Sequence, residues 1–92
     1  MNKNAFGTLY RSNGKIENIS FESNQVTVKE LQDCVGGHFE FVYLRDAKIM
    51  VVNEEGKLNN LPVNYQATLI ARTVINDFIV GDVLVIENKF VD

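Results

Sequence analysis

The chain has 92 residues, of which 46% are hydrophobic and 23% charged, so it fits one domain, residues 1–92, with a modest core. Its formal net charge is −3, which excludes a nucleic-acid binder that uses a strongly basic face. The single cysteine, Cys34, excludes an intrachain disulfide. The N-terminal segment lacks the apolar stretch of a signal peptide, and no run is long enough for a membrane span. We therefore expect a cytoplasmic protein that binds neither nucleic acid nor membrane.

The first two predicted elements form a β-hairpin. Strands are predicted over residues 5–11 and 15–21. The Asn13-Gly14 pair between them is typical of a type I′ turn, because both residues tolerate the positive φ that this turn requires. The apolar residues of the second strand, Ile16 and Ile19, differ in parity, which indicates a bulge or a frayed edge.

A short helix is predicted next, over residues 28–35. Thr27 and Glu30 have the spacing of a capping box, in which each side chain accepts the other residue's main-chain N–H. Gly36-Gly37 ends the helix, since glycine readily adopts the left-handed conformation. The apolar face of the helix is expected to consist of Val28, Leu31, Cys34 and Val35.

A second hairpin is predicted in the middle of the sheet, from strands at residues 38–44 and 48–52. Phe39, Phe41 and Tyr43 alternate with the other residues of the first strand and should share one face.

The segment from residue 51 to residue 64 then ends a strand and leads to a second helix, predicted over residues 65–72. Asn64 is a good N-cap, and Pro62 disfavours helix before it. A last, buried strand is predicted over residues 83–86, after a turn at Gly81-Asp82. The core face of the second helix is expected to consist of Ala67, Ile70, Ala71 and Val74.

The resulting order is β-β-α-β-β-α-β. It predicts an α+β fold with a small, mostly antiparallel sheet of about five strands and two short helices packed on one face.

The sequence offers no set of catalytic or metal-binding residues. A helix end and a turn separate Cys34 from the only histidine, His38, so a catalytic dyad is not expected. No spacing of acidic residues resembles a calcium loop. Adjacent acids such as Glu54-Glu55 are usually solvated in a polar turn. We therefore expect no enzyme, no metal and no cofactor.

A polar surface around the second helix is the candidate site. Tyr65, Thr68 and Arg72 fall at i, i+3 and i+7, opposite the core face. Arginine suits bidentate recognition of phosphate or carboxylate, and tyrosine suits stacking on a ring. An ordinary solvated helix face is the alternative. The predicted ligand-binding residues are Asn53, Glu54, Asn64, Tyr65, Thr68 and Arg72.

Five motifs occur along the chain in this order: ELQDCVGG at residues 30–37, VVNEEGKL at 51–58, LPVN at 61–64, Ala67-Thr68 and IVGDVLV at 79–85. The ordered set resembles a family of small domains of unknown function from bacteriophages and mobile elements of low-GC bacteria. The resemblance covers residues 27–86 and implies a phage or prophage origin, the cytoplasm of the host cell and a non-structural role. It carries over no catalytic residues.

Two functions remain open on these grounds. The first is a non-catalytic accessory protein that sequesters an anionic, nucleotide-like ligand, such as a signal of host defence; this rests on analogy with other small phage proteins. A chain of 92 residues can hardly enclose such a ligand alone, which favours a pocket in a homo-oligomer. The alternative is a protein-interaction module that inhibits or modulates a host or phage protein.

Overall fold

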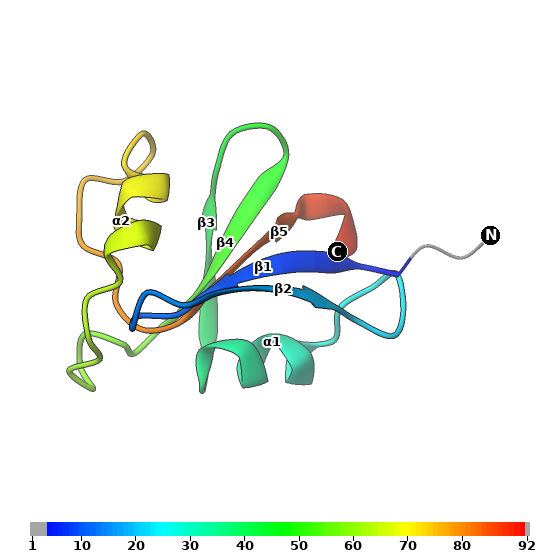
Figure 1. Ribbon diagram of the computed structural model, residues 1–92, viewed down its shortest axis with the longest axis horizontal. Coiled ribbons are helices and arrows are strands. Elements are labelled where there is room, and N and C mark those ends of the chain that lie inside the picture. Colours follow the sequence, from blue (N-terminus) through cyan, green and yellow to red (C-terminus); the bar gives the residue numbers. More distant parts are fainter. Residues whose placement is uncertain (1–3, 92) are drawn as a thin grey trace.

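The structure, a computed structural model, describes residues 4–91 and contains one five-stranded antiparallel sheet with two α-helices (Figure 1). The predicted α+β fold and element order are confirmed. In chain order the elements are β1 (Phe6–Tyr10), β2 (Ile16–Ser20), α1 (Val28–Val35), β3 (Phe39–Tyr43), β4 (Lys48–Asn53), α2 (Tyr65–Ala71), β5 (Val83–Glu87) and a 3₁₀ helix, η1 (Asn88–Phe90).

The last strand lies at the centre of the sheet, whose order is β2-β1-β5-β4-β3. β5 pairs with β1 on one side and β4 on the other, so that Leu84 stands between Leu9 and Val51. Because β5 has a partner on both sides, it joins the two hairpins into one sheet. The prediction that the second hairpin lies in the middle of the sheet is half wrong, because β4 is internal whereas β3 is an edge strand.

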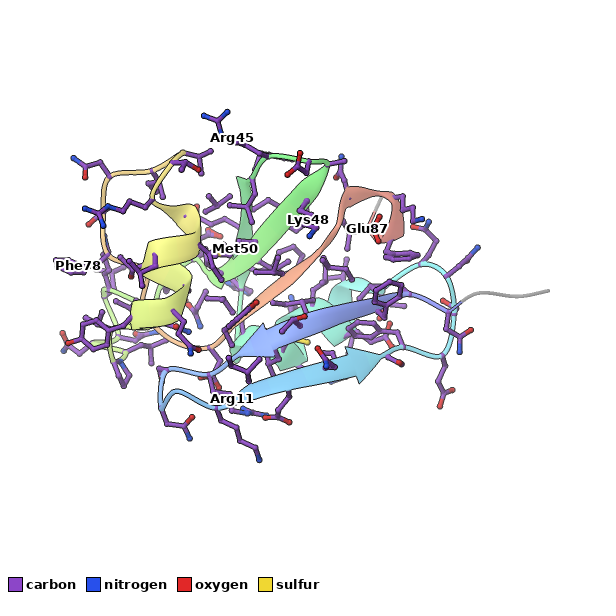
Figure 2. The ribbon with its side chains drawn as sticks, turned by 45° about the horizontal axis from the view of Figure 1, so that its top comes forward. Arg11, Arg45, Lys48, Met50, Phe78 and Glu87 are labelled. Atoms are coloured by element: carbon purple, nitrogen blue, oxygen red, sulfur yellow. The ribbon has the colours of Figure 1, made fainter. Side chains whose placement is uncertain are left out.

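The two helices pack on opposite faces of the sheet, so the prediction of a single helical face is wrong. Ile49 and Val51 of β4 belong to the core cluster that α1 covers. Met50 and Val52 belong to the cluster that α2 covers, and Figure 2 shows Met50 beside this helix. Successive residues of a strand point to opposite faces, so a strand that is apolar at every position needs cover on both. The run of apolar residues in β4 therefore requires one helix on each side.

The turn of the first hairpin differs from the predicted type. Gly14 has a φ of 95°, but Asn13 is not among the residues of positive φ, so the turn is not type I′. The Gly14 N–H donates to the Arg11 carbonyl and the Arg11 N–H to the Lys15 carbonyl, both at 2.9 Å, which makes a three-residue loop with glycine in the left-handed position. β2 pairs with β1 in continuous register, and Ile16 is 52% exposed at its end.

The predicted helix caps are confirmed. The Glu30 N–H donates to Thr27 Oγ1 at 3.1 Å, and the Thr27 N–H donates to Glu30 Oε1 at 2.9 Å. Gly36 ends α1 with a φ of 81°. Two predicted core residues are exposed instead: Val28 turns outward in the first turn of α1, and Val74 follows the end of α2, where helical spacing no longer applies.

Candidate functional site

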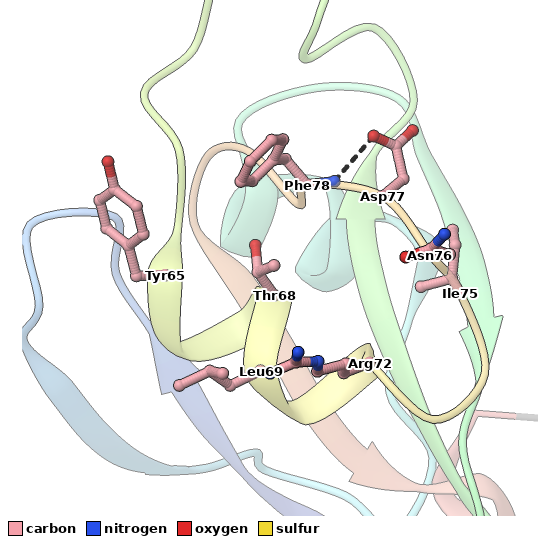
Figure 3. A pocket seen from close by; sticks show the side chains of 8 residues that line it. All are labelled: Tyr65, Thr68, Leu69, Arg72, Ile75, Asn76, Asp77 and Phe78. Carbon is pink, nitrogen blue, oxygen red and sulfur yellow. Dashed lines mark hydrogen bonds between the residues drawn. The ribbon is translucent and has the colours of Figure 1, made fainter.

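An open pocket of about 470 Å³ lies on the outer side of α2, between the helix and the loop that follows it (Figure 3). Its volume is within the range of small-molecule sites. We call it the α2 pocket. Its lining residues are Tyr65, Thr68, Leu69, Arg72, Ile75, Asn76, Asp77 and Phe78.

Three of the six predicted site residues meet in this pocket: Tyr65, Thr68 and Arg72. The Tyr65 side chain is 71% exposed, so its ring is free to stack. The Thr68 hydroxyl is already engaged, because it donates to the Asn64 carbonyl at 2.8 Å and accepts the Ile79 N–H at 2.9 Å. Arg72 is exposed and forms no salt bridge with any residue from 4 to 91. Its guanidinium therefore retains its capacity for an anion.

Asn64 lies outside the pocket, in the interior. Its side chain is buried, with 1% exposed, and every polar group of its amide has a partner. Oδ1 accepts the Ala67 N–H at 3.0 Å, which caps α2. Nδ2 donates to the carbonyls of Tyr10 and Gly81, both at 2.8 Å. Asn64 thus links α2 to β1 and to Gly81, shortly before β5, by hydrogen bonds, but it does not line the pocket.

Asn53 and Glu54 also lie away from the α2 pocket. The Asn53 amide donates to the Val35 carbonyl at 3.1 Å and accepts the Glu55 N–H at 2.8 Å. It thereby satisfies a carbonyl at the end of α1 that has no partner within the helix. Glu54 is exposed and lines a second, smaller depression of about 200 Å³, which we call the inner groove. The two pockets share Ile75, Asp77 and Phe78, so this part of the loop stands between them.

Sequence reasoning missed the second wall of the pocket, formed by residues 75–78. Phe78 is 59% exposed, although its apolar neighbours in sequence suggest a buried strand. Leu69 was also missed; it is 62% exposed on the outer side of α2. Its spacing of four from Tyr65 could have placed it on the same helix face. Only the return of the loop beside the helix, which no local pattern encodes, could have identified Phe78.

Contacts to the rest of the chain hold this loop in place. An ion pair joins Asp77 to Lys57, and the Ile79 N–H donates to Thr68 Oγ1 on α2. Within the loop, the Phe78 N–H donates to Asp77 Oδ1 at 2.7 Å. Lys57, and after it the Phe78 N–H, hold the pKa of Asp77 below its usual value. Since Lys57 balances the charge of Asp77, the positive charge of Arg72 is the one at the pocket that no described carboxylate neutralises.

The thiol of Cys34 is half-buried on the inner side of α1. Burial, and then the nearby charges of Asp33 and Glu30, raise its pKa above the usual value. A thiol that stays protonated is a poor nucleophile. Among residues 4–91, no group of three or more His, Cys, Asp or Glu side chains is placed to hold a metal ion.

Comparison with known proteins gives one match. The model of a family described as a domain of unknown function, DUF3846, matches residues 8–90, and the chain belongs to this family. The match includes most of the N-terminal hairpin, which the motifs noted above leave out. No curated protein and no solved structure gives a significant match. Within the described residues, no helix is long and apolar enough to cross a membrane.

Proposed function

We propose that this member of the DUF3846 family is a non-catalytic binding protein whose α2 pocket takes a small anionic ligand with a planar ring, such as a nucleotide. One observation carries the proposal: two exposed aromatic rings, Tyr65 and Phe78, share an open pocket with an arginine that no described carboxylate pairs. Figure 3 shows the two rings standing apart, with Thr68 below them.

The aromatic residues supply the contact to the ring of the ligand. Tyr65 and Phe78 are 71% and 59% exposed, which leaves two large apolar surfaces in water. Covering such surfaces with a planar ring is favourable, at about 25 cal/mol for each Å² of apolar area removed from water. Stacking geometry adds on the order of 1 kcal/mol.

Arg72 supplies the contact to the anionic part. Its planar guanidinium presents a fork of N–H donors that matches two oxygens of a phosphate or carboxylate. The charge of the neighbouring Asp77 is balanced by Lys57, so repulsion of an anion by that carboxylate is reduced.

Binding without chemistry would serve to withdraw a ligand from its receptor. The resemblance to phage and mobile-element domains supports one such role, in which the protein sequesters a nucleotide signal of host defence in the cytoplasm of the infected cell. This role needs only affinity and abundance, and it requires no catalytic residue.

Calorimetric titration with a panel of nucleoside monophosphates, cyclic mononucleotides and cyclic dinucleotides tests the proposal. At least one of them should bind, and Arg72→Ala should weaken binding roughly tenfold or more, because hydrogen bonds to a charged group contribute about 1.5–3 kcal/mol. Arg45→Ala is the matched control, since Arg45 is an exposed arginine at the tip of the β3–β4 turn (Figure 2). No heat of binding at millimolar concentrations of every nucleotide would overturn the proposal.

A second pair of variants tests the aromatic contact. Tyr65→Ala should weaken binding, whereas Tyr43→Ala should not, although the two tyrosines are similarly exposed, at 71% and 64%. Equal losses in both variants would contradict stacking on Tyr65.

One observation favours a protein partner as the second candidate. Leu58 is 82% exposed beside Phe78, so apolar surface continues from the α2 pocket into the inner groove. Exposed apolar surface of this kind is typical of protein interfaces. Leu58→Ser distinguishes the candidates: it should leave nucleotide affinity unchanged, whereas capture of a stoichiometric host protein that this variant abolishes would support the second one.

A further inference from the structure

The outer edge of β3 is open, and the main-chain hydrogen bonds show which residues face it. The Glu54 N–H donates to the His38 carbonyl and the Leu44 N–H to the Lys48 carbonyl, both at 2.9 Å. Because paired and unpaired positions alternate along an antiparallel strand, the even-numbered residues of β3 bond to β4. The N–H and C=O groups of Phe39, Phe41 and Tyr43 therefore point out of the sheet.

The two edges of the sheet differ in how well they resist further pairing. β2 has the sequence IENIS, and its central residues are polar. β3 has the sequence FEFVY, with Glu40 as its single charge, and it pairs with β4 in continuous register without a bulge. Proline, lysine and bulges are the usual devices that protect an edge strand, and neither β2 nor β3 has any of them. The two edges differ instead in their side chains, because β3 carries four apolar or aromatic residues and β2 carries two. The edge of β3 is thus open to another strand.

We propose that two copies of this chain pair through β3, antiparallel and related by a two-fold axis at Phe41, so that the two sheets become one. In this register Phe41 faces Phe41, and Phe39 faces Tyr43 of the second copy. All three residues whose main-chain groups point out of the sheet then have a partner. Two hydrogen bonds for each of the three pairs give six.

The neighbouring registers are worse for stated reasons. Centring the pairing on Glu40 or on Val42 leaves two hydrogen-bonded pairs within the strands instead of three. The register centred on Glu40 also sets two carboxylates directly opposite each other, and such like-charge pairs are destabilising. In the proposed register Glu40 stands opposite Val42 of the second copy. The strand is therefore complementary to itself in one register.

The aromatic side chains of β3 support the same pairing. The rings of Phe39 and Phe41 stack with centroids 5.4 Å apart, and those of Phe41 and Tyr43 meet edge to face at 6.2 Å. All three lie on the face that α1 covers, yet Tyr43 remains 64% exposed. Pairing brings Phe39 of the second copy beside Tyr43, and cross-strand aromatic pairs of this kind stabilise sheets.

The dimer would also alter the inner groove. Glu40 and Val42 line this groove from the opposite face of β3. Since Val42 of the second copy comes opposite Glu40, each groove gains a wall from the other subunit. The proposed dimer does not depend on ligand binding at the α2 pocket, which contains no β3 residue.

Proline substitutions at the two edges test the proposal. At Tyr43 a proline removes an N–H that faces outward, and proline is tolerated on edge strands. Ile16→Pro is the matched control on β2, because the bonds from Arg11 to Lys15 and from Phe21 to Ala5 make the Ile16 N–H face outward too. Native mass spectrometry should show a dimer for the wild type and for Ile16→Pro, and a monomer for Tyr43→Pro. A monomeric wild type at high micromolar concentration, or a dimeric Tyr43→Pro, would overturn the proposal.

Hydrogen exchange of the wild type gives an independent reading, which stands even if Tyr43→Pro fails to fold. The amides of Phe39, Phe41 and Tyr43 should exchange more slowly as protein concentration rises, because the dimer covers them. Exchange of these amides that is fast and independent of concentration would contradict pairing through β3.

Discussion

The two faces of the sheet are built differently. On one face α1 contacts β3, β4 and β5 and buries Leu31 and Val35 in a cluster of eleven buried residues. On the other face α2 presents only Ala67 and Ala71 as fully buried residues, in a cluster of six. Ile70 of α2 packs partly buried against this cluster, whereas Tyr65 and Leu69 are mostly exposed on the outer side of the helix.

This difference suggests that the two helices contribute to different properties, α1 to stability and α2 to binding. A leucine that is buried contributes to folding, whereas a leucine that stays in water is available to a partner. Leu31 and Val35 of α1 are buried in the core, whereas Tyr65 and Leu69 of α2 stay in water. We therefore expect mutations on the α1 face to change the free energy of unfolding, and mutations on the α2 pocket to change binding.

A matched pair of leucines should give the largest contrast. Leu31 on α1 is 3% exposed, so Leu31→Ala should lower the free energy of unfolding by about 3 kcal/mol. Leu69 on α2 is 62% exposed, so Leu69→Ala should stay within about 0.5 kcal/mol of the wild type. Urea denaturation followed by circular dichroism measures both. Equal losses would show that α2 packs by its outer side as well.

For the two N-caps, by contrast, the larger loss in the free energy of unfolding should come from α2. Asn64 caps α2 and also holds the carbonyls of Tyr10 and Gly81 in the interior, so Asn64→Ala should cost about 2–3 kcal/mol. Thr27 caps α1 at the surface, and Thr27→Ala should cost about 1 kcal/mol. The same denaturation experiment compares them. A smaller cost for Asn64→Ala would mean that its buried bonds add little to the placement of α2.

The ion pair beside the pocket should have the smallest effect, and a pH-dependent one. Lys57 lowers the pKa of Asp77 in the folded protein, so the pair stabilises the fold above the unfolded pKa of this carboxyl. That contribution is lost as the pH falls through the lowered folded pKa. Lys57→Ala should raise the pKa of Asp77 toward its usual value, which an NMR titration of the carboxyl carbon reads directly. An unchanged pKa of Asp77 in Lys57→Ala would contradict an ion pair between the two residues.

Local signals were sufficient to predict the two ends of α1. The Thr27-Glu30 capping box and Gly36 are separated by a few residues, and both behave as the sequence predicts. Asn64 was likewise identified as a cap, because capping is a local interaction. Its burial and its bonds to two distant carbonyls depend on the packing of α2 against β1 and β5, which no local pattern encodes.

Two features could not be predicted without knowledge of the fold: which face of the sheet each helix covers, and which residues line the pocket. The unbroken apolar run of β4 contained the information that both faces are covered, but the prediction placed both helices on one face. The site was predicted around α2, and Tyr65, Thr68 and Arg72 do meet there, whereas the other three predicted residues, Asn53, Glu54 and Asn64, do not line the pocket. Phe78 completes the pocket because the loop after α2 folds back beside the helix, over a distance in sequence that helical periodicity does not reach.

An NMR titration tests the central claim, that the α2 pocket is the recognition site, most directly. The panel of nucleotides is added to ¹⁵N-labelled protein, and the amide shifts are mapped onto the sequence. The account predicts that the ligand which binds shifts amides of residues 65–78 and leaves those of α1 unchanged. Shifts confined to the α1 face, or no shift with any nucleotide at millimolar concentration, would contradict it.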